Sequence, residues 1–151
     1  MPQSLVQIYV HVVYSTKHRK PFLKDSEFRD RIHRYLAGIC RNLKCPALRA
    51  GGTEDHVHIL CRIGSNIAVA DLIRDLKRDS SKWVKLEQPR LAEFHWQRGY
   101  GAFSVSPSHV AALREYIANQ EAHHRHETFQ EEFRRVCRKY GLEIDERYVW
   151  D

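Results

Sequence analysis

Alternating hydrophobic and polar residues mark the first predicted element, a β-strand over residues 5–15. Successive side chains of a strand point to opposite faces, so apolar residues at every second position form one buried face. In this segment that face consists of Val6, Ile8, Val10 and Val12. The same kind of pattern predicts strands over residues 48–52 and 55–63, joined near Gly51 and Gly52 as a hairpin.

Apolar residues that recur every three or four positions predict four amphipathic helices. The first begins at a cap formed by Asp25 or Ser26, and the second begins at a cap formed by Asn66. The dipeptide Ser106–Pro107 opens the third helix, and the last spans about residues 128–140. The predicted buried stripe of the second helix consists of Val69, Leu72, Ile73, Leu76, Trp83 and Leu86.

The elements follow one another as strand, helix, strand, strand, helix, strand, helix, where the fourth strand is a bent strand or hairpin within residues 94–105. This order predicts an α+β fold, a ferredoxin-like antiparallel sheet with helices packed on it. A length of 151 residues, 42% of them hydrophobic, is enough for one core without disulfides. We therefore expect a single domain over residues 1–151.

The chain carries 25 Lys and Arg residues against 19 Asp and Glu residues, a formal net charge of +6. This surplus of positive charge favours a polyanionic partner such as nucleic acid. No segment approaches the ~20 apolar residues that span a bilayer, and the N-terminus lacks the pattern of a secretion signal, so we expect a cytoplasmic protein without membrane contact. The cysteines lack Cys-x-x-Cys spacing and are predicted to be buried, reduced thiols: Cys40, Cys45, Cys61 and Cys137.

The most informative motif is His56-Val57-His58, inside the third predicted strand. The imidazoles lie two residues apart, so they share one face of the strand while Val57 and Ile59 face a core. Two imidazoles on one face can hold a metal ion, although such a pair can also serve only to satisfy hydrogen bonds beside a sheet. Asp55 precedes the pair and can orient an imidazole, as carboxylates do around many metal sites.

A second motif lies in the third predicted helix, where Tyr116 and Gln120 are four residues apart and therefore neighbours on one surface. The amide oxygen of Gln120 can complete a metal site with the two histidines, and His123 or His124 can compete with it for that role. His124 and His126 cannot chelate one ion if the helix continues through them, because they then point about 200° apart.

Imidazole nitrogens combined with an amide oxygen suit Mn²⁺ or Mg²⁺ acting as a Lewis acid, and zinc also accepts these ligands. A tyrosine beside such an ion can attack a phosphodiester and form a covalent phosphotyrosine link. A phenol has a pKa near ~10, so Tyr116 needs a nearby base or cation to become a nucleophile. The alternative is that Tyr116 has no chemical role and only packs against its neighbours as a residue of a helix.

These motifs and two others together resemble the single-tyrosine HUH transposases of insertion sequences that move as single-stranded DNA, including their REP-associated relatives. Asp-His-Val-His over residues 55–58 is followed by Leu-x-Arg-Asp-Leu-Lys-Arg-Asp-Ser-Ser over residues 72–81. Trp-Gln-Arg-Gly-Tyr-Gly-Ala-Phe-Ser-Val then spans residues 96–105, and Tyr-Ile-x-Asn-Gln spans residues 116–120. The resemblance covers residues 17–148, which is nearly the whole chain.

The resemblance implies the HUH endonuclease type of ferredoxin-like fold and a divalent metal, Mg²⁺ or Mn²⁺. It also implies a homodimer, which can place the tyrosine helix of one subunit against the histidines of the other. It implies that His56, His58 and Gln120 are metal ligands and that Tyr116 is the nucleophile. Cleavage of single-stranded DNA beside a foldback hairpin would leave a 5′-phosphotyrosine and a free 3′-hydroxyl, and strand transfer would reverse that step. Residues 127–151 are expected to form a C-terminal helical extension, as in longer branches of the family, which either helps to bind DNA or covers the site.

DNA contacts are predicted from two basic segments, whose charges can neutralise phosphates: Lys17, Arg19, Lys20, Lys77, Arg78 and Lys82. Three aromatic residues, Trp96, Tyr100 and Phe103, can stack on bases or belong to the core. One alternative function is a catalytically silent or domesticated module that binds DNA or RNA hairpins without needing Tyr116 or a metal. Another is a metal-independent histidine phosphoesterase, although its usual two separated histidine motifs are missing from the sequence.

Overall fold

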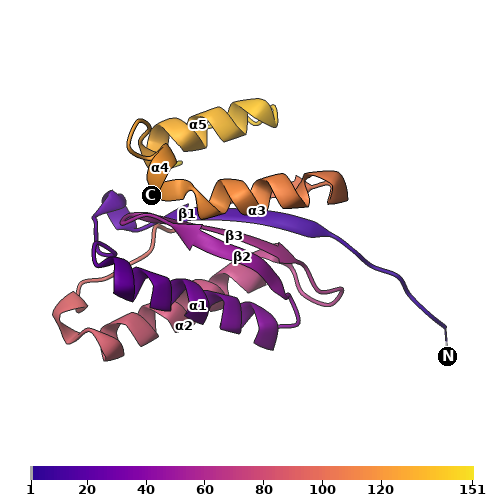
Figure 1. The fold of residues 1–151 in the computed structure, drawn as a ribbon, viewed down its shortest axis with the longest axis horizontal. Helices are drawn as coiled ribbons and strands as arrows, with labels where there is room; N and C mark the ends of the chain where they lie inside the picture. Colours follow the sequence, from indigo (N-terminus) through magenta and orange to yellow (C-terminus); the bar gives the residue numbers. More distant parts are fainter. Residues whose placement is uncertain (1) are drawn as a thin grey trace.

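A four-stranded antiparallel sheet forms the centre of the computed structural model, which describes residues 2–151 (Figure 1). Its strands are β1 Tyr9–Ser15, β2 Ala47–Gly52, β3 His56–Arg62 and β4 Gly101–Val105. The strand order is β2-β3-β1-β4, so β1 and β3 are the two central strands. This is the ferredoxin-like arrangement that the order of the elements predicts, and the α+β fold class is confirmed.

Helices cover both faces of the sheet. In Figure 1, α1 and α2 lie below the sheet, and α3, α4 and α5 lie above it. The helices are α1 Ser26–Asn42, α2 Val69–Glu87, α3 Val110–Ala118, α4 Gln120–His123 and α5 Phe129–Lys139, and the short 3-10 segments are η1 Lys17–Arg19, η2 Pro89–Leu91 and η3 Pro107–His109. Among the residues that the structure describes, no helix is both long enough and apolar enough to cross a bilayer.

The main core lies between the sheet and the layer of α1 and α2. Asp25 caps α1, as predicted, because its carboxylate accepts hydrogen bonds from the backbone N–H groups of Glu27 and Phe28, at 3.0 and 3.3 Å. Fully buried residues from the sheet and both helices fill this core: Val12, Val57, Ile59, Ile32, Leu36, Leu72 and Leu76. The four cysteines are buried and free, as predicted.

A second, smaller core attaches the C-terminal residues to the opposite face of the sheet. Phe129, Phe133 and Cys137 of α5 pack against Val13 of β1 and Phe103 of β4. Trp150, near the C-terminus, contacts the rings of Phe129 and Phe133, with centroid distances of 6.4 and 5.9 Å. The predicted helix over residues 128–140 is confirmed, and its apolar side fixes α5 over the middle of the sheet.

The start of the first strand was predicted too early. β1 begins at Tyr9, whereas Leu5, Val6 and Ile8 are exposed by 85%, 46% and 53%. Tyr9 pairs with Arg62 and with Val105, which are the last residues of β3 and β4. Before Tyr9 the strand pairing stops, although the backbone oxygen of Ile8 still accepts a hydrogen bond from the N–H of Ile63 at 2.8 Å. Alternation of side chains alone cannot reveal where the neighbouring strands end.

Two details of the second helix also differ from the sequence prediction. The residue that caps α2 is Ala68, whose carbonyl accepts from the N–H of Leu72 at 3.1 Å, so Asn66 is not the cap. Leu86 is 72% exposed, although it was assigned to the buried stripe. Val84 is buried in the last turns of α2, and a residue two positions further along points about 200° away from it.

Candidate active site

His56 and His58 lie side by side on the face of β3 that α3, α4 and α5 cover. Both side chains are fully buried, and their ring centroids are 5.1 Å apart. Val57 and Ile59 point to the other face and belong to the main core. The alternation inferred from the sequence therefore places both imidazoles together, away from the apolar core.

Each imidazole is fixed through its Nδ1 atom. Asp55 Oδ1 lies 2.7 Å from His56 Nδ1, and Thr53 Oγ1 lies 2.9 Å from the same atom. His58 Nδ1 lies 2.8 Å from Nε2 of His11, a buried residue of β1. These contacts leave the Nε2 atoms of both histidines directed into one shared space. In metal sites, a hydrogen bond to the other ring nitrogen orients a histidine ligand in the same way.

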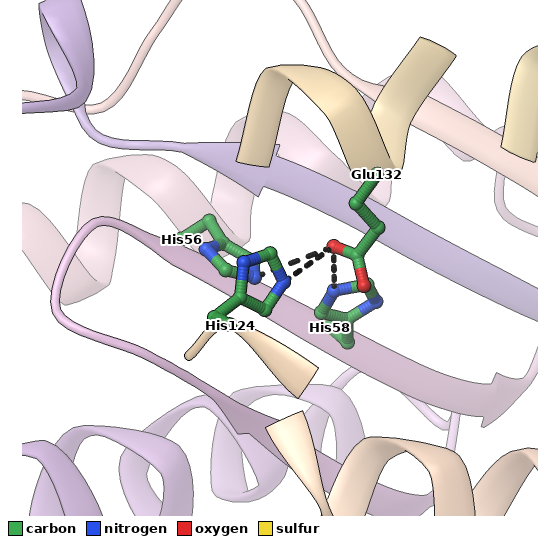
Figure 2. Close-up of side chains that lie close together, drawn as sticks. All are labelled: His56, His58, His124 and Glu132. Atoms are coloured by element: carbon green, nitrogen blue, oxygen red, sulfur yellow. Dashed lines mark hydrogen bonds and ion pairs between the residues drawn. The ribbon is translucent and has the colours of Figure 1, made fainter. Parts of the chain in front are cut away.

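The carboxylate of Glu132 and the imidazole of His124 complete a four-residue cluster in that space (Figure 2). Glu132 Oε1 lies 2.9 Å from Nε2 of His58, 3.1 Å from Nε2 of His124 and 3.5 Å from Nε2 of His56. One donor atom from each of the four residues lies within 4.8 Å of all the others. Three imidazole nitrogens and one carboxylate form a donor set that fits a divalent ion.

Gln120 reaches the same cluster. Its side chain is 1% exposed, its Oε1 lies 2.9 Å from His56 Nε2, and its Nε2 donates to Glu132 Oε2 at 3.1 Å. The predicted continuous helix is interrupted, because α3 ends at Ala118 and α4 begins at Gln120, with Asn119 in a non-helical conformation between them. The structure thus gathers the predicted ligands His56, His58 and Gln120 and adds two more donors.

Tyr116 places its hydroxyl group on the edge of this cluster. The hydroxyl donates a hydrogen bond to Glu132 Oε2 and accepts one from Arg135 Nη2 at 2.8 Å. The guanidinium of Arg135 is held in turn by the carboxylate of Glu127, at 2.9 and 3.1 Å. The Tyr116 ring lies 6.0 Å from the ring of His58, centroid to centroid. The candidate nucleophile therefore contacts both an anion and a cation.

A close approach of α3 to the sheet brings Tyr116 to this position. A Cβ atom added to Gly51 of β2 would lie 2.9 Å from the backbone oxygen of Ile117 and 2.9 Å from its Cγ2 atom. Ile117 is 1% exposed and directly follows Tyr116. The absence of a side chain at Gly51 therefore allows α3 to lie close above β2.

The protonation states of the cluster depend on its burial and on the contacts between its carboxylate and its imidazoles. Burial alone would raise the pKa of Glu132, but the imidazoles of His58 and His124 outweigh burial and hold that pKa well below its usual range. Burial would likewise lower the pKa of His124, but the Glu132 carboxylate outweighs it and the net shift is upward. For His58 the effect of burial dominates, and its pKa is lowered. Glu132 is thus an anion that faces imidazole nitrogens.

Burial lowers the pKa of His11 to about 3, so this residue is neutral at physiological pH. A neutral imidazole can accept a hydrogen bond at Nε2, and His58 can then donate from its Nδ1. The Nε2 lone pair of His58 stays available for a metal ion. His11 therefore acts as a positioning residue for His58.

We expect His11→Ala to lower the affinity for a divalent ion by about 10- to 100-fold, because His58 loses the partner that fixes its ring. Calorimetric titration with Mn²⁺ measures this effect. His95→Ala removes an exposed imidazole outside the cluster and is the matched control. Unchanged Mn²⁺ affinity in a folded His11→Ala protein would show that His58 needs no such support.

Two of the groups that build this site, Glu132 and His11, were not identified from the sequence. His124 was considered only as a rival of Gln120 for the third ligand position, but the chain turns after His123 and directs His124 inward beside Gln120. Glu132 resembles any acidic residue of an amphipathic helix, and His11 resembles any polar residue of a strand. One signal was available: Glu132 directly precedes Phe133 and lies three residues after Phe129, on the side of α5 that packs against the sheet.

The basic residues predicted to bind DNA are not gathered at the site. Lys17, Lys20 and Lys82 are exposed, whereas Arg19 donates to the backbone oxygen of Trp150 at 3.3 Å. Arg78 forms an ion pair with Asp79 at 2.9 Å. Because α2 covers the face of the sheet opposite to Tyr116, its basic residues lie on the far side of the molecule from the candidate nucleophile (Figure 1).

Lys77 is directed toward the protein instead of toward solvent. Its Nζ atom donates to the backbone oxygens of Gln97, Arg98 and Gly99, at 2.7, 3.1 and 2.7 Å. Burial lowers the pKa of this amine to about 8. The observed contacts of Lys77 stabilise the loop before β4. Its contact with DNA remains a prediction, as it does for the other five basic residues.

The chain matches one protein family and is similar to solved structures. The family model for IS200-like transposases matches residues 4–120. The chain is similar to the crystal structure of a candidate transposase from Deinococcus radiodurans, with a TM-score of 0.61 and 24% identity over 80% of this chain and 95% of that one. It is also similar to a REP-associated tyrosine transposase bound to a REP hairpin, with a TM-score of 0.59 and 11% identity over 82% of this chain and 72% of that one. A search of curated proteins found no match.

Proposed function

This chain belongs to the IS200-like transposase family, and we propose on that basis that it cleaves and rejoins single-stranded DNA through a covalent bond between Tyr116 and a phosphate. The observation that supports this most directly is the position of Glu132. Its carboxylate accepts the hydrogen bond of the Tyr116 hydroxyl and also contacts three imidazole nitrogens. The candidate nucleophile and the candidate metal ligands thus share one carboxylate.

Burial and the adjacent Glu132 carboxylate raise the pKa of Tyr116, so this phenol needs both a proton acceptor and a nearby cation to attack a phosphodiester. In the proposed step the Tyr116 oxygen forms a bond to phosphorus, the bond from phosphorus to the 3′ oxygen breaks, and that oxygen takes up a proton. Glu132 Oε2 accepts the hydrogen bond of the phenol and therefore contacts the proton that the phenol must lose. Arg135 Nη2 places a positive charge 2.8 Å from the oxygen on which negative charge develops. Rejoining reverses each change.

We propose that His56, His58 and Gln120 hold a divalent ion, Mg²⁺ or Mn²⁺, together with Glu132 and His124. A bound ion of this type polarises the phosphate and stabilises the charge of the transition state. Asp55 and His11 orient the two strand histidines from outside this set. All of these groups, and Tyr116 as well, come from one chain, which is the arrangement of an active site formed in cis. The homodimer stays an expectation from the resemblance.

We propose single-stranded DNA that carries a hairpin as the substrate, because a structural neighbour, the REP-associated tyrosine transposase, is bound to a REP hairpin. The test is a denaturing gel of the protein with labelled hairpin oligonucleotides from the DNA that flanks its gene. We expect a covalent protein–DNA adduct with Mn²⁺ or Mg²⁺ and none with chelator. Tight binding without any adduct across several flanking sequences would instead identify a silent hairpin-binding module.

A further inference from the structure

A groove of about 510 Å³ opens beside Tyr116, between β4, α3 and α5. This volume is in the usual range for sites that bind small molecules or single nucleotides. Its walls are mostly apolar and include Leu113 and Val136, while Tyr116 and His11 connect it to the candidate active site. A chain of DNA that placed a phosphate at the Tyr116 hydroxyl would therefore place a neighbouring nucleotide beside this groove.

Tyr140 forms a rigid aromatic wall of the groove. Its ring stacks on Phe103, with centroids 5.0 Å apart and planes at 19°, and its hydroxyl donates to the backbone oxygen of Ser104 at 3.2 Å. The residue is nevertheless 42% exposed. One side of the ring is thus fixed by Phe103 while much of the residue stays open to a ligand. Stacking on such aromatic rings is the main way in which proteins hold unpaired bases.

The polar groups of the groove suit a nucleotide more than an apolar ligand. Lys139 lines the groove, and among the described residues it forms no ion pair. The hydroxyl of Ser106 and the ring of His109 also line it, with Oγ and Nδ1 2.8 Å apart. A cation with nearby hydroxyl and imidazole groups can contact the sugar and phosphate of a nucleotide whose base lies against the apolar wall.

We infer that this groove binds one unpaired base of the single-stranded DNA, next to the phosphate that Tyr116 attacks. This inference rests on the proposed function for the identity of the ligand. In this proposal α3 and α5 not only position Tyr116 and Glu132 but also determine where the single-stranded DNA enters the site. The protein then needs no base pairing at that position, because stacking accepts any base.

Hairpin oligonucleotides that lack one base at a time along the single-stranded flank test the groove. Binding is measured by fluorescence anisotropy with chelator present, so that cleavage plays no part. We expect one position at which loss of the base weakens binding to the wild-type protein by about fivefold or more, the effect of losing one base–aromatic stack. If no position shows such a penalty, the groove does not hold a base.

Two variants then locate that penalty. Ala112→Trp fills the groove from α3, and Tyr140→Ala removes the aromatic wall; we expect the penalty to disappear in both. Ala111→Trp adds the same side chain at an exposed position of α3 outside the groove and should keep the penalty. A penalty that persists in folded Ala112→Trp and Tyr140→Ala proteins would overturn the inference. Adduct formation by wild-type protein tests the proposed function separately, since the anisotropy measurement does not depend on it.

Discussion

We expect Tyr116→Phe to abolish the proposed covalent protein–DNA adduct and to lower the cleavage rate by at least about a thousandfold, as loss of a covalent nucleophile does in other enzymes. The variant deletes one oxygen atom and keeps the ring that lies 6.0 Å from His58. Glu132 retains its contacts with His58 and His124, and Arg135 retains Glu127, so the site should stay assembled. A labelled hairpin oligonucleotide on a denaturing gel, with Mn²⁺, gives both the adduct and the rate.

Tyr148→Phe is the matched control, because Tyr148 is 65% exposed and lies away from the cluster. It should form the adduct at the wild-type rate. Binding of the same oligonucleotide, measured with chelator, should be unchanged in both variants. An adduct of wild-type yield in Tyr116→Phe would assign the nucleophile to another side chain and would remove the main support for the proposed mechanism.

Glu132→Ala is expected to have the second large effect, a loss of at least about tenfold in affinity for Mn²⁺ and a parallel loss of adduct formation. The substitution removes the only carboxylate of the four-residue cluster and the acceptor of the Tyr116 hydrogen bond. Glu132→Gln keeps the shape of the side chain but not its charge. We expect its Mn²⁺ affinity and its adduct formation to lie between those of Glu132→Ala and the wild type. Calorimetry with Mn²⁺ and the gel assay measure the two losses.

Glu131→Gln provides the control for Glu132, because it neutralises the adjacent, exposed carboxylate of the same helix. It should bind Mn²⁺ with wild-type affinity. A Glu132→Ala protein that bound Mn²⁺ as tightly as the wild type and cleaved faster would contradict our assignment. The Glu132 carboxylate would then hinder cleavage instead of binding the metal ion and the Tyr116 hydroxyl.

The sequence was sufficient to predict the residues whose position depends on local geometry. His56 and His58 share a face because alternate residues of any strand do, and Tyr116 and Gln120 remain near each other although the helix breaks at Asn119. Asp55 reaches His56 because the two are adjacent in the chain. The order of strands and helices likewise follows from local patterns, and it limits the possible sheets to a few topologies.

The residues missed by sequence analysis depend on contacts between distant segments. Glu132 is 1% exposed, although a glutamate in an amphipathic helix normally faces solvent. It is buried because Phe129 and Phe133 pack α5 against β1 and β4, and no local pattern states which surface α5 will cover. The position of His11 beside His58 depends in the same way on the pairing of β1 with β3.

The family match ends at residue 120, so it does not include His124, Glu132 or Arg135. The contacts of these residues with the cluster and with Tyr116 are therefore made by a C-terminal segment that lies outside the matched region. Relatives with a different segment in this place would need another partner for the tyrosine hydroxyl. Comparison of the C-terminal segments, rather than of the shared domain, should therefore distinguish members by their chemistry.

The attachment of α5 to the sheet also determines when the site can form during synthesis. A ribosome makes the chain from its N-terminus, and the strand histidines and Tyr116 are complete before residue 129, where α5 begins. Until α5 has emerged and packed on β1 and β4, Tyr116 lacks the carboxylate of Glu132 and the guanidinium of Arg135. A nascent chain thus carries Tyr116 without the groups that contact its hydroxyl until α5 has been made and has packed on the sheet.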